Sequence, residues 1–305
     1  MISQATMAQA LDLAVSSGST DISPDVQSEL EKARDREGIS SSREGLDQTI
    51  KSLLLSRERK VPACPDTGWP LFFFKVGNEA VLEGGILALE QLTREAVARA
   101  SAAGLLRRTM KHPLTGHDPG DNIGMNMPWF EYKFVPGNDL QITYVAKGGG
   151  SDVFGGTQST MVAFADGLVG IKKFIIDAYI VACRAGAVCP PSILGIGIGG
   201  TANVAATLAK EAACLRLIGS HHPEPCFHEL EDELAEAINS LGIGVMGAGG
   251  QTSVLGVHIE YAYTHIAGIA VAMSTNCFVA RRGTCTVSAD NHLTMRQDPD
   301  WFGGR

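Results

Sequence analysis

Three of the seven cysteines lie at turns, where a thiol could ligate a metal. Cys64 precedes Pro65, Cys189 precedes two prolines, and Cys277 follows a run of small polar residues. The intervals between them are far longer than those of a compact metal-binding motif, so spacing alone favours structural thiols. The other four are predicted to be small buried hydrophobes: Cys183, Cys214, Cys226 and Cys285.

A glycine-rich run offers a second kind of chemistry. The segment Gly195-Ile196-Gly197-Ile198-Gly199-Gly200 fits G-x-G-x-x-G at the end of a predicted strand, with Thr201 as a possible helix N-cap. Amides at a helix N-terminus can bind the phosphates of a dinucleotide, which would make the chain an NAD-dependent oxidoreductase. The run lies far from the first strand, where such a motif is usual, so a tight strand-to-helix turn is favoured. A substrate carboxylate could still use that helix start.

The elements that must position these residues alternate between helices and strands. Residues 1–60 are predicted to be helical, with Ser23 and Pro24 marking a helix start. Hydrophobic periodicity then predicts strands and helices in turn, and a long loop over 105–128. Strands are expected at 71–76, 129–135, 141–146 and 192–198, and helices at 86–103, 168–184, 202–214 and 228–241. Two further apolar segments follow at 253–260 and 266–275. We therefore predict one mixed α/β domain over residues 1–305 with a helical N-terminal portion.

Composition excludes several classes of partner. The 305 residues carry 25 Lys and Arg against 33 Asp and Glu, a net charge of −8, without a basic block that would bind nucleic acid or an anionic membrane. The longest uncharged stretch, 185–209, contains prolines and glycines and is predicted to be turn, strand, turn and helix instead of a membrane span. No signal peptide is visible and the cysteines are odd in number and scattered, so a cytoplasmic location is expected.

Five sequence motifs, in order, resemble the α subunit of the class I iron–sulfur fumarase and L-tartrate dehydratase family. The resemblance covers about residues 40–290. Its motifs are Cys64-Pro65-Asp66-Thr67-Gly68, Lys147-Gly148-Gly149-Gly150-Ser151, Cys189-Pro190-Pro191 with the glycine-rich run, Gly256-Val257-His258-Ile259-Glu260, and His265 through Cys277 to Arg281-Arg282-Gly283. The resemblance implies an Fe–S hydro-lyase α-type catalytic domain.

The resemblance implies a [4Fe-4S] cluster held by Cys64, Cys189 and Cys277, with the fourth iron open to substrate. Thiolates are the usual ligands of such clusters, and an iron without a protein ligand is a Lewis acid. Such an iron can bind a 2-hydroxy acid and make hydroxide a leaving group while a protein base takes the adjacent proton. This is hydro-lyase chemistry.

The resemblance also assigns residues to the substrate. His265 and Asp66 match active-site residues of the family, although His265 alone would be read as structural and Asp66 could instead form an Asx turn with Gly68. Arg107 matches an arginine that pairs with a substrate carboxylate, a role that suits the guanidinium fork, while an exposed basic pair is the simpler interpretation. Lys147 with Gly148, Gly149 and Gly150 is a plausible carboxylate cradle. His258 is left as a core residue.

The implied reaction converts L-tartrate to oxaloacetate or fumarate to malate, and mesaconate stays open as a substrate. The implied partner is a β-type subunit that completes the site, in an α2β2 assembly, so the chain alone is expected to be catalytically incomplete. Three departures from the family pattern lie in the expected substrate loops: Pro65, Ile123 and the run Asp152-Val153-Phe154. The alternatives are the NAD-dependent oxidoreductase and a non-catalytic iron–sulfur scaffold or sensor.

Overall fold

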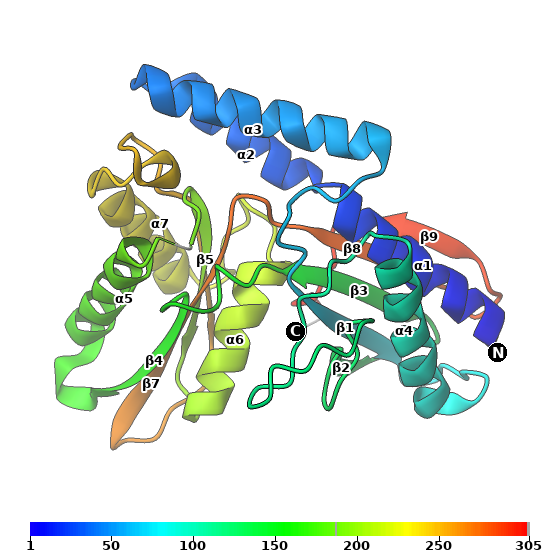
Figure 1. Cartoon of the computed structure of the whole chain (residues 1–305). Coiled ribbons are helices and arrows are strands. Elements are labelled where there is room, and N and C mark those ends of the chain that lie inside the picture. Colours follow the sequence, from blue (N-terminus) through cyan, green and yellow to red (C-terminus); the bar gives the residue numbers. More distant parts are fainter. Residues whose placement is uncertain (187, 304–305) are drawn as a thin grey trace. The chain divides into compact units, whose positions relative to one another are not determined.

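Two separate β-sheets organise the chain, and each belongs to its own unit of the structure (Figure 1). The computed structural model describes residues 1–186 and 188–303. Unit 1 comprises residues 1–23, 52–147 and 281–305, and unit 2 comprises residues 24–51 and 148–280. The predicted mixed α/β class with a helical N-terminal portion is confirmed. Because the two units interleave along the chain, no single cut separates them, and one domain over residues 1–305 stays a prediction.

The sheet of unit 1 has five strands in the order β2-β1-β3-β8-β9. β1 pairs in parallel with β2 and antiparallel with β3, and the remaining pairs are antiparallel. The strands are β1 (Trp69–Gly77), β2 (Trp129–Val135), β3 (Leu140–Lys147), β8 (Arg282–Val287) and β9 (Leu293–Arg296). Strands β8 and β9 were not predicted, because short strands after an irregular segment give little periodic signal in the sequence.

Successive side chains of β1 point to opposite faces of this sheet. Phe72 and Phe74 are buried in a core with helices α1 (Gln4–Thr20) and α4 (Gly85–Ala102). Phe73 points the other way and meets Trp301 edge to face at 5.4 Å between ring centroids. Both faces of the strand are therefore covered, which explains why its sequence is a continuous apolar run.

The sheet of unit 2 has four strands in the order β4-β7-β5-β6. β5 pairs in parallel with β6 and antiparallel with β7, which in turn pairs antiparallel with β4. The strands are β4 (Thr157–Ala163), β5 (Ser192–Ile198), β6 (Val254–Tyr261) and β7 (Gly268–Asn276). The sequence analysis missed β4, an edge strand whose polar sequence lacks an apolar run.

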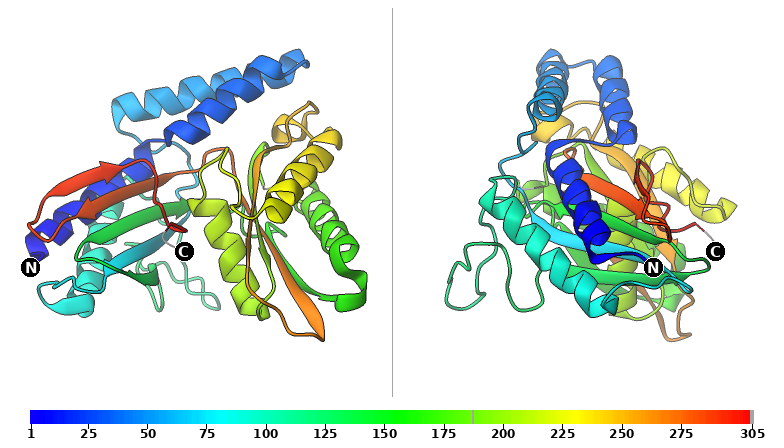
Figure 2. Two further views of the ribbon diagram at one scale, coloured as in Figure 1. Left: turned by 180° about the vertical axis from the view of Figure 1, so that it is seen from behind. Right: turned by 90° about the vertical axis from the view of Figure 1, so that its right-hand side faces the viewer.

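Helices cover both faces of this second sheet (Figure 2). Helices α5 (Gly167–Arg184) and α7 (Pro225–Ser240) share one core with the strands, and α6 (Ala202–Leu215) packs on the other face. Unit 2 also contains α2 (Pro24–Arg36), which begins at Pro24 as predicted, and two short 3₁₀ helices, η1 (Phe164–Asp166) and η2 (Val245–Gly247). Helix α3 (Ser40–Arg59) has its first residues in unit 2 and its last in unit 1.

Glycines on one face of β5 let α6 approach the sheet closely. Leu194 and Ile196 point into the core with α5 and α7, so the alternating Gly195 and Gly197 face α6. A Cβ atom built on Gly197 would lie 1.9 Å from the carbonyl oxygen of Ala205, and one on Gly195 would lie 2.1 Å from that of Ala209. These glycines are therefore a packing requirement.

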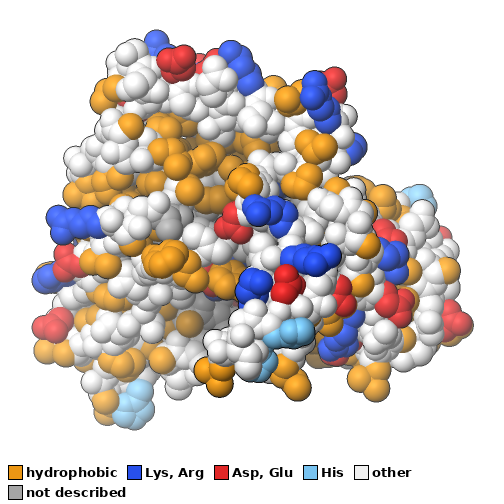
Figure 3. All heavy atoms as spheres, in the orientation of Figure 1, with side chains coloured by type: hydrophobic (Ala, Val, Ile, Leu, Met, Phe, Trp, Pro, Cys, Tyr) orange, Lys and Arg blue, Asp and Glu red, His pale blue; other side chains and the backbone are white. Residues whose placement is uncertain are grey.

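The surface carries charged side chains of both signs. On the face drawn in Figure 3, acidic and basic side chains are interspersed. Among the described residues, none of the helices combines the length and apolar character needed to cross a membrane. The uncharged stretch 185–209 contains β5 and the first part of α6.

The contact between β5 and α6 predicts the cost of adding one methyl group. Gly197→Ala should lower the free energy of unfolding by about 3 kcal/mol, the upper end of the range for overpacking, because backbone atoms must move. Urea denaturation measures this. The matched control is Gly124→Ala, whose Cβ would meet nothing within 4 Å and whose φ is ordinary. Equal midpoints for the two variants would contradict the packing argument.

Candidate active site

In unit 1, several residues that the sequence analysis selected lie at one edge of the sheet. Strand pairing sets Trp69, the first residue of β1, opposite Lys147, the last residue of β3. We call residues 60–68, between α3 and β1, the Cys64 loop. This loop leads directly into Trp69, so it reaches the same edge. Arg281 lies there as well, because its carbonyl accepts a hydrogen bond from Ala146 N at 3.3 Å. Lys147 itself is fully buried.

The Cys64 loop is held by a turn at Asp66. The Oδ1 atom of Asp66 accepts a hydrogen bond from Gly68 N at 3.0 Å, and Gly68 has a φ of 73°, which suits glycine. The Asx turn considered for Asp66 is therefore present. One carboxylate oxygen has this structural task, and a chemical role for Asp66 stays a prediction.

Arg107 is attached to the same loop at two points. Its backbone N donates to Thr67 Oγ1 at 2.9 Å, and its side-chain Nη1 donates to the carbonyl of Pro65 at 2.7 Å. Among the described residues, no acceptor bonds its Nε or Nη2, and the side chain is exposed. That edge of the guanidinium is the one that binds a carboxylate through two parallel hydrogen bonds.

Arg281 is a second arginine whose side chain is bonded to this loop, and it was not among the predicted site residues. Its Nη2 donates to the carbonyl of Asp66 at 2.7 Å, and its side chain is 2% exposed. Within residues 1–186 and 188–303, its Nε and Nη1 have no hydrogen-bond partner. Burying a cation with two unused donors lowers the stability of the fold unless an anion binds next to it. In the sequence, Arg281 belongs to one of the five family motifs but has no assigned role.

In unit 2, the register of β5 against β7 brings two candidate cysteines to one edge. Ile193 at the start of β5 pairs with Asn276 at the end of β7. Cys189 lies four residues before Ile193, and Cys277 directly follows Asn276. We call this edge the cysteine edge. Cys189 has a φ of 55°, and left-handed non-glycine residues of this kind concentrate at functional sites.

The glycine triplet lies at the cysteine edge too. Ser151, which follows Gly148, Gly149 and Gly150, accepts a hydrogen bond at its carbonyl from Thr275 Oγ1 at 2.8 Å. Ser151 Oγ also donates to the carbonyl of Gly148 at 3.0 Å. The loop is thus tied to the last residues of β7, next to Cys277.

His265 lies at the opposite end of β7. It precedes Gly268, the first residue of the strand, whereas Cys277 follows the last. Nine residues of extended strand span about 30 Å, so the structure does not bring His265 and Cys277 of the same chain together. His265 is exposed and lines a surface pocket of about 540 Å³ with residues of β4 and of the turn at 200–202. Its Nδ1 accepts from Ala267 N at 3.1 Å, which leaves Nε2 to carry the proton of the neutral ring.

The remaining cysteines differ from the three candidates. Burial raises the pKa of the Cys183 and Cys285 thiols, which keeps both protonated and poor as ligands. Cys214 is buried on α6, as predicted. Cys226 is different, because it is exposed near the start of α7 instead of being a buried hydrophobe.

The glycine-rich run does not form a phosphate cradle. The amides of Gly199 and Gly200 donate to the carbonyls of Ala270 at 2.7 Å and Tyr263 at 3.2 Å. Thr201 occupies the N-cap position of α6 as expected, but its hydroxyl donates to the side chain of Asn203 instead of capping the helix. The tight turn is therefore the better description, and nothing here favours the NAD-dependent alternative.

The donor set fits an iron–sulfur cluster. Cys64, Cys189 and Cys277 all lie in loops, and two of them share the cysteine edge. The orphaned donors of Arg281 next to the Cys64 loop suit an anionic group, which a cluster with thiolate ligands is.

Comparison with known proteins identifies the class. The family model described as fumarate hydratase matches residues 8–286, and the chain belongs to this family of hydro-lyases. A Methanocaldococcus jannaschii protein, provisionally named L(+)-tartrate dehydratase subunit alpha, is 38% identical over 88% of this chain and 93% of its own length. The L(+)-tartrate dehydratase subunit alpha of Escherichia coli K12 is 37% identical over 89% of this chain and 88% of its own. The chain is therefore an enzyme chain of the hydro-lyase class.

The position of Arg107 predicts a role for the buried Thr67 hydroxyl. Thr67→Val keeps the shape of the side chain but leaves Arg107 N without its acceptor, so stability should fall by about 1–3 kcal/mol. Chemical denaturation of the full chain measures this. Thr294→Val, at an exposed position on β9, is the control and should change little. Similar losses in both variants would mean that the hydrogen bond does not hold this loop.

Proposed function

We propose that this chain is the α subunit of a [4Fe-4S]-dependent hydro-lyase that removes water from, or adds it to, a four-carbon dicarboxylate. The observation that carries the proposal is a pair of arginines whose side chains are hydrogen-bonded to the Cys64 loop. Arg107 binds the carbonyl of Pro65 and Arg281 binds that of Asp66, so two cations lie beside a cysteine. Such a loop attracts anions, and both a thiolate-ligated cluster and a dicarboxylate are anionic.

Cys64, Cys189 and Cys277 are proposed to hold the cluster. Fumarate hydratase family membership and the position of all three cysteines in loops support this set. When bound, the cluster would supply a Lewis-acidic iron that binds the substrate hydroxyl and helps it to leave.

Arg107 is proposed to orient the substrate through one of its carboxylates. Nη1 is committed to Pro65, so the Nε and Nη2 edge is the part of the fork that remains for a ligand. Lys147 and the glycines 148–150 are proposed as the cradle for the second carboxylate. Their place at the sheet edge of unit 1 and at the cysteine edge of unit 2 supports this role.

Asp66 and His265 are proposed as the proton-transfer residues. Asp66 is two residues from Cys64, and its Asx turn fixes the carboxylate near the loop. His265 is separated from Cys277 of its own chain by the length of β7. It is therefore proposed to act on a second copy of the chain, which agrees with the α2β2 assembly expected from the sequence. Its pocket and its protonated Nε2 suit an exchange of protons with a ligand.

L-tartrate, converted to oxaloacetate, is the preferred substrate, with fumarate hydration to malate as the alternative. The relatives of matching length are named as tartrate dehydratase α subunits, which supports this preference and the need for a β-type partner. In the dehydration, a C–O bond breaks and the departing hydroxide takes a proton from a protein acid to become water, while the C–H proton on the adjacent carbon passes to a protein base. The enol that results becomes oxaloacetate by tautomerisation. A cytoplasmic location would protect such a cluster.

The proposed ligand set predicts which cysteines control iron content. Cys64→Ser, Cys189→Ser and Cys277→Ser should each lose most of the iron after anaerobic reconstitution, because a hydroxyl is a poor substitute for a thiolate. Iron and sulfide analysis, with the visible absorbance of the cluster, measures this.

The four other cysteines provide matched controls. Cys183→Ser, Cys214→Ser, Cys226→Ser and Cys285→Ser should retain iron if they remain folded. Full retention in any of the first three variants would remove that cysteine from the ligand set.

The free edge of Arg107 predicts a large kinetic effect. In a complex with its β-type partner, Arg107→Ala should reduce kcat/KM for L-tartrate by about 100-fold or more, since hydrogen bonds to a charged group contribute about 1.5–3 kcal/mol each and two are lost. Arg107→Lys should restore little, because an ammonium cannot form two parallel bonds.

Arg108→Ala is the control, since Arg108 is the exposed neighbour. It should leave kcat/KM within a few-fold of the wild type. Unchanged iron content in Arg107→Ala would separate a substrate role from support of the Cys64 loop. Normal kinetics in that variant would exclude Arg107 from the site.

A further inference from the structure

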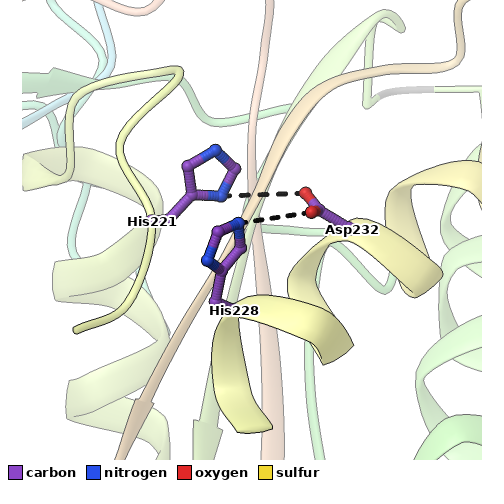
Figure 4. Close-up of side chains that lie close together, drawn as sticks. All are labelled: His221, His228 and Asp232. Carbon is purple, nitrogen blue, oxygen red and sulfur yellow. Dashed lines mark ion pairs between the residues drawn. The ribbon is translucent and has the colours of Figure 1, made fainter. Parts of the chain in front are cut away.

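A second group of potential ligands lies in unit 2, apart from the cysteines. His228 and Asp232 are four residues apart on α7, so they share one face of the helix. His221 comes from the loop between α6 and α7. Figure 4 shows the two imidazole rings side by side with the Asp232 carboxylate next to a nitrogen of each. None of these residues has a part in the proposed hydro-lyase reaction.

The distances between the polar atoms are close to those of a metal site. His228 Nε2 lies 3.3 Å from Asp232 Oδ2, and His221 Nδ1 lies 3.7 Å from Asp232 Oδ1. One ligand atom from each residue lies within 4.8 Å of the others. A tetrahedral Zn²⁺ ion with bonds of about 2.0–2.1 Å holds its ligand atoms about 3.3 Å apart. Small side-chain rotations would therefore suffice.

The loop that bears His221 is fixed to α7 by a buried glutamate. Glu231 is 2% exposed and accepts hydrogen bonds from His222 N at 2.9 Å and from Ile259 N at 2.8 Å. The Nδ1 atom of His222 already accepts a hydrogen bond from Glu224 N at 3.0 Å, so His222 is not counted among the ligands. The backbone next to His221 is thus held against the turn of α7 that bears Asp232. Positioning of this kind lowers the entropy lost on binding a metal.

The two neighbouring imidazoles and one carboxylate form a donor set that an ion can reach from solvent. The ring centroids of His221 and His228 are 3.9 Å apart, and their side chains are 45% and 43% exposed. An ion can therefore reach both rings without breaking the core. Two neutral imidazoles and one carboxylate suit Zn²⁺, and three protein ligands leave a coordination position for water.

We propose that His221, His228 and Asp232 bind one Zn²⁺ ion with an open coordination position. The site is separate from the cysteines proposed for the cluster. It joins the α6–α7 loop to α7, so occupation should also stabilise this part of unit 2.

The test is zinc binding by the full chain, measured anaerobically with chelator-buffered Zn²⁺. The wild type should bind one equivalent more than His228→Ala and Asp232→Asn at the same free zinc concentration. The affinity of that equivalent should fall at least about 10–100-fold, the loss typical even of a residue outside the ligand shell. Zinc held by cysteines is common to all these proteins and cancels in the comparison.

Two matched controls and a spectrum make the result specific. Glu229→Gln on the same helix and His292→Ala in unit 1 are exposed and should bind as the wild type does. With Co²⁺, the difference spectrum of wild type minus His228→Ala should show d–d bands without thiolate charge transfer. Equal stoichiometry in the wild type and in folded His228→Ala, checked by circular dichroism, would overturn the proposal.

Discussion

The antiparallel pairing of β5 with β7 is the constraint on which the arrangement of unit 2 depends. Because Ile193 pairs with Asn276, the loop before β5 and the loop after β7 must emerge at one edge, and these loops contain Cys189 and Cys277. The same pairing sends His265 to the far end of the sheet. A shift by one residue would reverse the faces of β5 and direct Leu194 instead of glycine toward α6.

That strand also explains the abundance of glycine. In the sequence, the run from Gly195 to Gly200 resembles a site for phosphate, since glycine permits close approach of a ligand. In the structure, the close approach is made by the protein itself: the carbonyls of α6 take the space of the missing side chains, and the amides of Gly199 and Gly200 are bonded to carbonyls. Tight helix packing and anion binding leave similar signatures in sequence, and only hydrogen-bond partners separate them.

In unit 1, the important constraint is different: the irregular Cys64 loop is held in place by two arginine side chains. Arg107 and Arg281 each use one side-chain nitrogen to fix a backbone carbonyl near Cys64 and keep other donors available. Fixed donors cost less reorganisation when an anion binds than donors that must first be ordered. The arrangement favours an anionic cofactor and an anionic substrate at the same place, as the hydro-lyase proposal requires.

The sequence by itself determined the α/β class, most element boundaries and the family, because periodicity and ordered motifs are local properties of the chain. It also indicated Cys64, Cys189 and Cys277 through the turns around them, and the resemblance turned these scattered thiols into a ligand set. Only the tertiary structure decided that Cys189 and Cys277 share an edge, that His265 does not, and that Arg281 is buried with unused donors. Strand register and burial depend on residues far apart in the sequence, so neither the partner of a strand nor the environment of an arginine can be read from its neighbours.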